Sequence, residues 1–455
     1  MKFAVENFKI FKQKTEFDIR PITVLVGPNG YGKSTVFEAL ELFSSFNLEK
    51  DSQFGDRYKS ENIEKALRGF DFNKVKGRRL STDLLSRGSD SPSFIFTFFD
   101  EKRELDLVYN SEKNQDYGNY SEFSFLVGRI VDREEPDFFG LLDTNDFNIV
   151  PLESFRANNK SITKEQYKKI TAGFKQKITN LLSVYQGYNF LSTSRHINEK
   201  FTLLDTLSLK STEIEKLLLL YSKIDFRSKI DSVHRAHIRR IVKDTNQYFS
   251  MLFNSEIRFF LKVDHENRLG SIKYTQNEKE FFLSELSFGM VSGFTICLLL
   301  ALANNKVHAG LNKYIYQTNK RVYSEDGEPG WETLFLSTLA LAEPEMNMHP
   351  NAQSKLADIF VTSVNNHKTT FVIETHSEYL IRRLQYLVAK KDISKDMIQI
   401  YYFNDPNNLE EGDERVYSIK INDDGSLTRP FGSGFFDEAD KNSLELLLLN
   451  RTQQN

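Results

Sequence analysis

The sequence reads Gly27-Pro28-Asn29-Gly30-Tyr31-Gly32-Lys33-Ser34-Thr35 directly after the apolar run Ile22 to Val26. This stretch fits the pattern G-x-x-x-x-G-K-[ST], in which glycines allow backbone N–H groups to surround phosphate oxygens. The lysine of the pattern places a positive charge beside the outer phosphates, and the hydroxyl that follows it is a ligand for Mg²⁺. We therefore predict that a nucleoside triphosphate binds here, at the N-terminus of a helix.

The residues of this phosphate-binding loop have distinct predicted roles. Lys33 contacts the outer phosphates, and Ser34 is the predicted metal ligand. The predicted nucleotide-binding residues are Gly27, Asn29, Gly30, Gly32, Lys33, Ser34 and Thr35. Apolar residues follow the loop at helical spacing, namely Val36, Phe37, Leu40 and Phe43. The sequence thus supplies the strand, loop and helix that the motif requires.

Composition narrows the class of protein. The 455 residues include 60 basic and 63 acidic side chains, so the formal net charge is −3 and any DNA contact needs a local basic patch. The single cysteine, Cys297, excludes a disulfide within the chain and a zinc site built from cysteines. The longest apolar stretch, Phe294 to Ala303, is about half as long as a membrane span, and the first residues lack the apolar core of a signal peptide. We expect a cytoplasmic protein without a membrane segment.

A basic helix is predicted in the middle of the chain. Apolar residues at helical spacing predict that Ser211 to Phe253 is largely helical. The other face of this helix carries basic side chains, namely Lys229, His234, Arg235, Arg239, Arg240 and Lys243. Such a face can contact DNA phosphates, but it is more often a solvated surface with acidic neighbours. DNA contact at this helix is therefore the less favoured of two interpretations.

Three further motifs lie in the second half of the chain. Leu286-Ser287-Phe288-Gly289 precedes an apolar helix, where a hydroxyl and open amides suit either a phosphate or an ordinary helix start. Glu343 follows the apolar stretch Leu334 to Ala342, and a carboxylate there can orient the attacking water. His376 follows the short apolar run Thr370 to Ile373, from which it can contact a terminal phosphate. Each motif is weak alone, but their order behind the phosphate-binding loop favours a single site.

In this order the four motifs resemble the ABC-type ATPase family, which includes SMC-like proteins and many bacterial AAA ATPases. The resemblance covers residues 1–45 and 280–380. It implies an α/β fold, a P-loop ATPase head in which helices flank a mixed sheet, with an inserted helical segment. The implied cofactors are ATP and Mg²⁺. The implied roles are the Walker A loop for Gly27 to Thr35, the signature for Ser287 and Gly289, the catalytic glutamate for Glu343 and the switch histidine for His376.

The resemblance also implies a division of the chain and an assembly. Residues 1–150 are expected to form the N-terminal part of the head, with the phosphate-binding loop and a loop-rich insertion. Residues 151–265 are expected to be a mainly helical insertion, and residues 266–455 the C-terminal part with the other motifs. The signature of one subunit, Ser287 with Gly289, closes in this family over ATP bound to another subunit. We therefore expect a homodimer or a higher even-numbered homo-oligomer.

Two departures from the family pattern concern hydrolysis and partner contacts. The Walker B strand usually ends in Asp-Glu, but Ala342 occupies the aspartate position before Glu343. Loss of that metal-holding carboxylate predicts slow hydrolysis, or a chain that binds ATP as a sensor. The polar stretch Asn304 to Trp331 reads as an insertion between the signature and Walker B, which would place it near the dimer interface. No glutamine is assigned to the Q-loop.

A narrower resemblance links the C-terminal half to the PtuA family, the ATPase subunits of Septu antiphage systems, including retron-linked Septu. It rests on the segments Glu343-Pro344-Glu345, Glu374-Thr375-His376-Ser377 and Gly434-Phe435-Phe436-Asp437-Glu438. Those ATPases work with a separate HNH nuclease, PtuB. The resemblance implies that this chain controls an HNH nuclease partner in antiviral defence, with the nucleotide setting the state of the assembly.

Other classes of protein provide alternatives. OLD-family proteins join a similar ATPase to a TOPRIM nuclease, but the tail offers only Asp423-Asp424-Gly425, which a turn explains more simply. A transporter ATPase normally has its signature much nearer to Walker A. An SMC-like DNA-repair ATPase normally carries long heptads or a Cys-x-x-Cys hook, which this sequence lacks. The alternatives that stay open are such a DNA-repair ATPase and an ATP-sensing scaffold that does not hydrolyse ATP.

Overall fold

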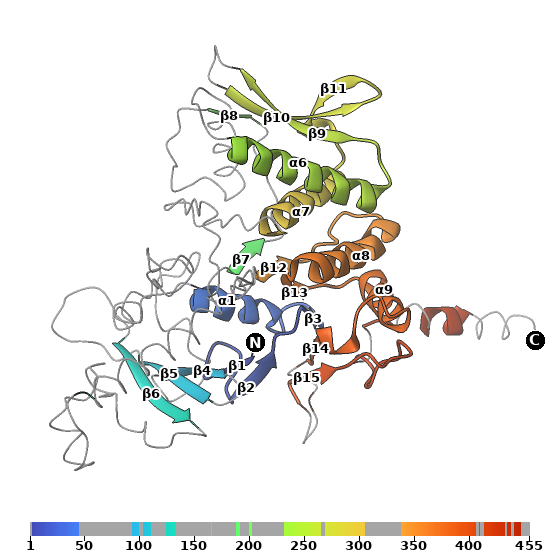
Figure 1. Cartoon of the computed structure of the whole chain (residues 1–455). Helices are drawn as coiled ribbons and strands as arrows, with labels where there is room; N and C mark the ends of the chain where they lie inside the picture. The colour runs from blue at the N-terminus through green and yellow to red at the C-terminus, as the bar shows by residue number, and fades with distance from the viewer. Residues whose placement is uncertain are drawn as a thin grey trace, which may run out of the picture. The chain divides into compact units, whose positions relative to one another are not determined.

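The computed structural model of the chain, shown in Figure 1, contains two compact units. The described residues are 2–44, 93–99, 103–110, 124–132, 165, 188–191, 200–202, 232–264, 269–304, 338–405, 409, 414–432, 435–437 and 441–446. The first unit consists of Met1–Ile19, Gly32–Tyr188 and Tyr316–Leu336, and the second of Arg20–Tyr31, Asn189–Ile315 and Ser337–Asn455. Among the described helices, none is long and apolar enough to cross a membrane.

The first unit is built on an antiparallel sheet with the strand order β2-β1-β4-β5-β6. Its elements are β1 (Lys2–Glu6), β2 (Thr15–Asp18), α1 (Lys33–Ser44), β4 (Ser93–Phe99), β5 (Arg103–Asn110) and β6 (Ser124–Asp132). Alternation along β4 places Phe94 and Phe96 on one face, where their rings lie 5.4 and 5.1 Å from the ring of Phe8. A phenylalanine cluster therefore packs the loop after β1 against β4.

The second unit is built on a six-stranded mixed sheet with the order β15-β14-β3-β13-β12-β7. Its strands are β3 (Ile22–Val26), β7 (Tyr188–Leu191), β12 (Thr338–Ala342), β13 (Thr370–Glu374), β14 (Ile398–Phe403) and β15 (Val416–Ile419). The strands β12, β13, β3 and β14 run parallel, and β15 runs antiparallel to β14. Every residue of these four parallel strands is buried, which explains their nearly continuous apolar sequences. The α/β fold with a mixed sheet that the sequence predicts is confirmed.

Helices pack on one another in the core of the second unit. They include α6 (Ser232–Phe253), α7 (Phe288–Asn304), α8 (Pro350–His367) and α9 (Glu378–Ala389). α6 lies beside α7 and α8 beside α9, as Figure 1 shows. The rings of Phe249 on α6 and Phe294 on α7 both contact Phe259, at centroid distances of 4.6 and 4.2 Å. α7 is buried on nearly all sides beyond its first turn, as its apolar sequence requires.

A small antiparallel sheet joins this helical layer. Its strands are β8 (Lys200–Thr202), β9 (Arg258–Asp264), β10 (Leu269–Gln276) and β11 (Lys279–Phe282). The other three strands each pair with β10 in antiparallel orientation. The Asn246 amide of α6 donates to the Phe259 carbonyl at 3.1 Å and accepts from the Phe259 N–H at 2.7 Å, so α6 is hydrogen-bonded to β9. Where residues 151–265 are described, they thus contain strands as well as α6. The rest of the predicted helical insertion, and the predicted insertion after Asn304, lie outside the described residues.

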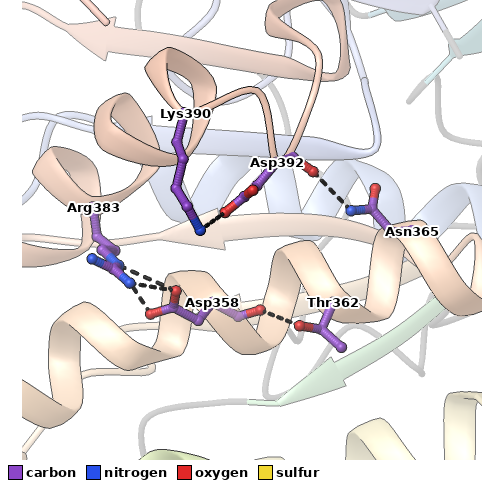
Figure 2. Close-up of polar contacts among 6 residues, drawn as sticks. All are labelled: Asp358, Thr362, Asn365, Arg383, Lys390 and Asp392. Atoms are coloured by element: carbon purple, nitrogen blue, oxygen red, sulfur yellow. Dashed lines mark hydrogen bonds and ion pairs between the residues drawn. The ribbon is translucent and has the colours of Figure 1, made fainter.

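Polar contacts fix α9 on α8, as Figure 2 shows. The Arg383 guanidinium of α9 donates to both carboxylate oxygens of Asp358 on α8, at 2.8 to 3.2 Å. The Asn365 amide donates to the Asp392 carbonyl at 2.9 Å, and the Lys390 ammonium lies 2.8 Å from the Asp392 carboxylate. The Asp358 carboxylate raises the pKa of Arg383 by hydrogen bonding. Because α9 begins just after His376, these contacts restrict the position of the turn that carries this histidine.

Candidate nucleotide site

The backbone of the phosphate-binding loop has the conformation that only glycine tolerates. Gly27 and Gly32 have φ angles of 140° and 103°, in the region that L side chains avoid. A Cβ atom on Gly27 would lie 2.6 Å from the Phe403 carbonyl oxygen, and one on Gly32 would overlap the side chain of Ile10. Close approach of neighbouring backbone and side chains therefore requires glycine at both positions, independently of any phosphate.

The last residues of the loop, Lys33, Ser34 and Thr35, form the first turn of α1. Lys33 is the first residue of α1 and only 2% exposed, and Thr35 donates its N–H to the Gly32 carbonyl at 3.0 Å. Ser34, in contrast, is exposed, so its hydroxyl is open to a ligand. A lysine is seldom buried so deeply unless a polar or charged group compensates for its lost hydration. The helix start thus offers one buried cation and one accessible hydroxyl.

The parallel strands of the second unit all end at one edge of the sheet. The register pairs Ala342 with Glu374, Glu374 with Leu25, and Val26 with Tyr402. The residues that follow these strands are therefore neighbours at this edge, where open α/β sheets bind their ligands. The structure thus brings the predicted residues Glu343 and His376 to the edge from which the phosphate-binding loop departs.

Glu343 holds a sharp turn at the end of β12. Its φ angle is 44°, which a residue other than glycine adopts at a cost of roughly 1 kcal/mol or more. The Glu343 N–H donates to the Glu374 carbonyl at 2.7 Å, and its carbonyl accepts from the Met346 N–H at 3.1 Å. The side chain is half-buried. Backbone strain of this kind is often found at functional sites, and the catalytic role of Glu343 stays a prediction.

Glu345 joins the end of β12 to the turn of His376, and sequence reasoning assigned it no role. Its side chain is 7% exposed, and its Oε1 accepts the His376 N–H at 2.8 Å. Its Oε2 is buried and has no hydrogen-bond partner among the described residues. Burial raises the pKa of this carboxyl, although the bond from His376 acts in the opposite direction. The sequence shows the Glu-Pro-Glu pattern, but not which of the two carboxylates turns inward.

Further hydrogen bonds hold the same two turns together. Ser377 caps α9 by accepting the Leu380 N–H at 3.2 Å, and its hydroxyl donates to the Gln353 side chain at 2.6 Å. The Gln353 amide in turn donates to the Met348 carbonyl at 2.9 Å. Thr375 donates its N–H to the Leu25 carbonyl at 3.1 Å. Hydrogen bonds therefore connect the ends of these strands with the turns that follow them.

The predicted signature starts α7. Ser287 precedes the helix, and its carbonyl accepts the Val291 N–H at 3.0 Å, the arrangement of a helix cap. Ser287 is exposed, as is the neighbouring Phe288 at 76%. Gly289 is buried against the turn after Glu343. A Cβ atom at this position would overlap the Asn347 carbonyl. Ser287 is thus presented at the surface, while Gly289 packs the start of α7 against the Glu343 turn.

The donors for Mg²⁺ differ from the usual set. The methyl group of Ala342 stands at the end of β12, where it offers no oxygen. Among the described residues, no group of three or more His, Cys, Asp or Glu side chains could hold a metal ion. Ser34 is exposed and offers a hydroxyl oxygen at the helix start. This fits Mg²⁺ held mainly by phosphate oxygens and water, with one protein ligand, because Mg²⁺ keeps several waters in most sites.

The basic helix is described only in part. Arg239, Arg240 and Lys243 of α6 are exposed, and Lys229 lies outside the described residues. Arg240 of α6 lies near His367 of α8. The pKa of His367 is lowered, mainly by burial; Asp244 opposes this shift and Arg240 adds to it. Acidic and basic groups are therefore mixed along this surface. Its DNA contact stays a prediction.

These features define the class of protein. A glycine-rich loop between a buried strand and a helix is the arrangement found in P-loop ATPases. The chain belongs to the AAA ATPase domain family (AAA_15), which matches residues 1–381. Residues 393–446 match a second family, which is described as a protein family of unknown function (DUF3696). No match was found among curated proteins.

Solved structures of SMC head domains are similar over most of the chain. An SMC head bound to the C-terminal winged-helix domain of ScpA is 12% identical, with 92% of this chain and 97% of that chain covered and a TM-score of 0.47. A head with an extended coiled coil, bound to the C-terminal domain of ScpA from Pyrococcus furiosus, is 12% identical, with 92% and 96% covered and a TM-score of 0.43. The SMC head of Thermotoga maritima is 12% identical, with 89% and 95% covered and a TM-score of 0.37. These similarities concern the path of the backbone alone.

Proposed function

We propose that the chain binds ATP with Mg²⁺ at Gly27 to Thr35 and hydrolyses it slowly at the carboxyl ends of the parallel strands. One observation carries this proposal: β3, which leads into the loop, lies between β13 and β14, and β12 lies beyond β13. This order places Glu343 and His376 at the loop's edge of the sheet. ATP binding is also what membership of the AAA ATPase domain family implies.

In this proposal the chain's own groups divide the work. Backbone N–H groups of the loop and Lys33 bind the phosphates, and Ser34 is the protein ligand of Mg²⁺. When bound, Mg²⁺ neutralises charge on the phosphate oxygens. Glu343 orients the attacking water and accepts its proton, and His376 contacts the terminal phosphate. Ala342 lacks the carboxylate that would help to hold the metal, so the reaction is slow.

We further propose that the site is completed by a second copy of the chain. Exposure of Ser287 at the start of α7 supports this step, because a hydroxyl at the start of a helix can bind a phosphate. The signature of one subunit would close on the triphosphate of its partner. The functional assembly is then a homodimer or a higher even-numbered homo-oligomer, and ATP holds it in one geometry.

The biological role that we propose is control of an HNH nuclease, similar to PtuB, in antiphage defence. It rests on the sequence resemblance of the segments around Glu343, His376 and Phe435 to the ATPase subunits of Septu systems. In this role the nucleotide state of the dimer biases the bound nuclease between two states. Purification of the tagged chain from its host, followed by mass spectrometry, should recover an HNH protein. Recovery of a transporter or of a repair nuclease instead would contradict this role.

A second candidate function is an ATP-occupied scaffold without turnover, and Ala342 is the observation that favours it. The two candidates differ in phosphate release. We expect the native chain to bind ATP and to release phosphate, and Lys33→Ala to do neither. If the native chain binds ATP and neither protein releases phosphate, the scaffold is correct and the enzyme is not.

Subunit mixing tests the composite site. In a mixed dimer of Lys33→Ala and Ser287→Arg chains, the loop that lacks the Lys33 cation faces the signature that Ser287→Arg blocks, so both changes fall in the same site. Each homodimer of these variants should be inactive, but a mixed dimer keeps one complete site. Mixing should therefore restore up to about half of the native activity per mixed dimer. Absence of any recovery, with subunit exchange shown by native mass spectrometry, would contradict a site shared between subunits.

A further inference from the structure

Two strands of the segment of unknown function, residues 393–446, belong to the same sheet as β3, which leads into the phosphate-binding loop. β14 from this segment pairs in parallel with β3, from Ile398 opposite Ile22 to Tyr402 opposite Val26. β15 extends the sheet beyond β14. This segment therefore cannot be a separate domain, because β14 is an inner strand next to the strand that leads into the phosphate-binding loop.

The end of β14 contacts the phosphate-binding loop at two points. The Phe403 carbonyl lies so near Gly27 that a Cβ atom on this glycine would stand 2.6 Å away. Burial raises the pKa of Tyr31, and Asp405, two residues after Phe403, raises it further through hydrogen bonding and its charge. Both contacts lie within the second unit. The C-terminal segment therefore touches the beginning of the loop and its middle.

The same segment also reaches the predicted switch histidine. The Phe435 ring lies 6.2 Å from the His376 ring, measured between centroids. Phe435 in turn packs on Phe436 at 4.4 Å, on Tyr402 at 5.5 Å and on Phe431 at 5.6 Å. We name these four residues, Tyr402, Phe431, Phe435 and Phe436, the C-terminal aromatic cluster. One face of this cluster therefore meets His376.

Hydrogen bonds fix the chain that carries the cluster. The Tyr417 hydroxyl of β15 donates to the Pro430 carbonyl at 3.0 Å. Thr428 donates its N–H to the Lys420 carbonyl at 2.9 Å and accepts the Lys420 N–H at 2.9 Å. The Phe435 N–H donates to the Gly432 carbonyl at 3.3 Å, which closes a turn. The position of Phe435 is therefore set by the β14–β15 hairpin and not by a loose tail.

We propose that Phe435 is a positioning residue for His376, and that β14, β15 and Phe435 thereby form part of the nucleotide site. The proposal rests on the proposed function, in which His376 contacts the terminal phosphate. The Glu345 carboxylate holds the His376 main chain from one side, and the Phe435 ring limits the imidazole from another. Removing the ring enlarges the volume open to the imidazole without changing any group that binds ATP. Such a misplacement lowers the rate of the chemical step more than the affinity for ATP.

The test is Phe435→Leu, with Phe360→Leu as its matched control. Phe360 is a fully buried ring on α8 that packs on Phe371, at the other end of β13 from His376. Both variants lose one aromatic ring, which is fully buried at Phe360 and half-buried at Phe435, but only Phe435→Leu changes the surroundings of His376. We expect kcat to fall about tenfold in Phe435→Leu, with KM for ATP within about twofold of native, and Phe435→Tyr to recover most of the loss. Phe360→Leu should keep the native kcat.

A second measurement tests the geometry without hydrolysis. In protein labelled with ¹³C-histidine, the His376 signal is assigned among the eight histidines by its loss in His376→Gln. Phe435→Leu should shift this signal in the nucleotide-free protein, because the ring current of Phe435 is removed, and Phe360→Leu should not. Phe435→Met carries the same prediction if the leucine variant does not fold.

The two measurements separate the possible failures. If Phe435→Leu shifts the His376 signal but the native chain releases no phosphate, the proposed function is contradicted and the contact between Phe435 and His376 is intact. An unshifted His376 signal in Phe435→Leu overturns the positioning role, as does an equal loss of kcat in Phe360→Leu.

Discussion

Two alanine substitutions in the phosphate-binding loop provide a matched pair of stability measurements. Gly27 has a φ of 140° and Gly30 a φ of 83°, so alanine is strained at both. At Gly30 an added Cβ meets nothing within 4 Å, whereas at Gly27 it lies 2.6 Å from the Phe403 carbonyl oxygen and 3.0 Å from the Phe403 Cβ. The pair therefore separates backbone strain from the close approach of β14.

The expected magnitudes follow from these two terms. The strained φ costs about 1 kcal/mol at either position. The overlap at Gly27 forces the backbone of β14 to shift, for which overpacking costs about 1–3 kcal/mol. Gly30→Ala should therefore lower the free energy of unfolding by about 1 kcal/mol, and Gly27→Ala by about 2–4 kcal/mol. The excess belongs to the contact between the loop and the C-terminal segment.

The assay is urea unfolding of the nucleotide-free proteins, followed by circular dichroism, since ATP would add its binding energy to the native state. Hydrogen exchange of the β14 amides provides a local readout, and these should exchange faster in Gly27→Ala than in Gly30→Ala. Equal losses of stability in the two variants would refute the reasoning. They would mean that β14 does not press against the start of the loop.

Three further predictions concern the strand ends and the α8–α9 contact. Burial raises the pKa of the Glu345 carboxyl, so the folded state binds the carboxyl proton more tightly than the unfolded chain does. Protonated Glu345 therefore contributes to the stability of the folded state. This contribution is complete at acidic pH and is lost as the pH rises through the folded-state pKa. The melting temperature of Glu345→Gln relative to native should therefore rise as the pH increases from below the ordinary carboxyl pKa through the raised pKa of Glu345; a constant difference would contradict this. Ala342→Asp should increase phosphate release on the order of tenfold by restoring a ligand for Mg²⁺, and an unchanged rate would show that the missing carboxylate does not limit hydrolysis. A double-mutant cycle of Arg383→Ala and Asp358→Ala should give a coupling energy of about 1 kcal/mol or less, because both side chains are partly exposed; a coupling of zero would remove the pair as a support of α9.

Local patterns in the sequence predicted the parts of the site that depend on neighbouring residues. The buried strand before Gly27, the helix after Gly32 and the strand ends at Glu343 and His376 each follow from a short apolar run that stops at polar or glycine residues. Residues within such a run share one environment, so the run itself carries the information. The convergence of these ends also follows, because parallel strands end at a common edge.

Contacts between distant segments could not be predicted in this way. Nothing near Ile22 or Ile398 indicates that the two residues pair, although this pairing brings β14 against the loop. Glu345 was part of a recognised motif, but its burial depends on the turn of His376, which lies on another strand. The need for glycine at Gly289 likewise arises from the Asn347 carbonyl. These features depend on the packed structure, which a single sequence does not specify by local periodicity.

The most direct test of the proposed ATPase is a comparison of native chain with Glu343→Gln. Glutamine keeps the size of the side chain but cannot accept a proton from water, so it removes the proposed base and little else. We predict that both proteins bind ATP with the same affinity, and that phosphate release by Glu343→Gln is lower by a factor on the order of 100 or more. Equal phosphate release by the two proteins would contradict the assignment of Glu343 and the account of hydrolysis at the strand ends.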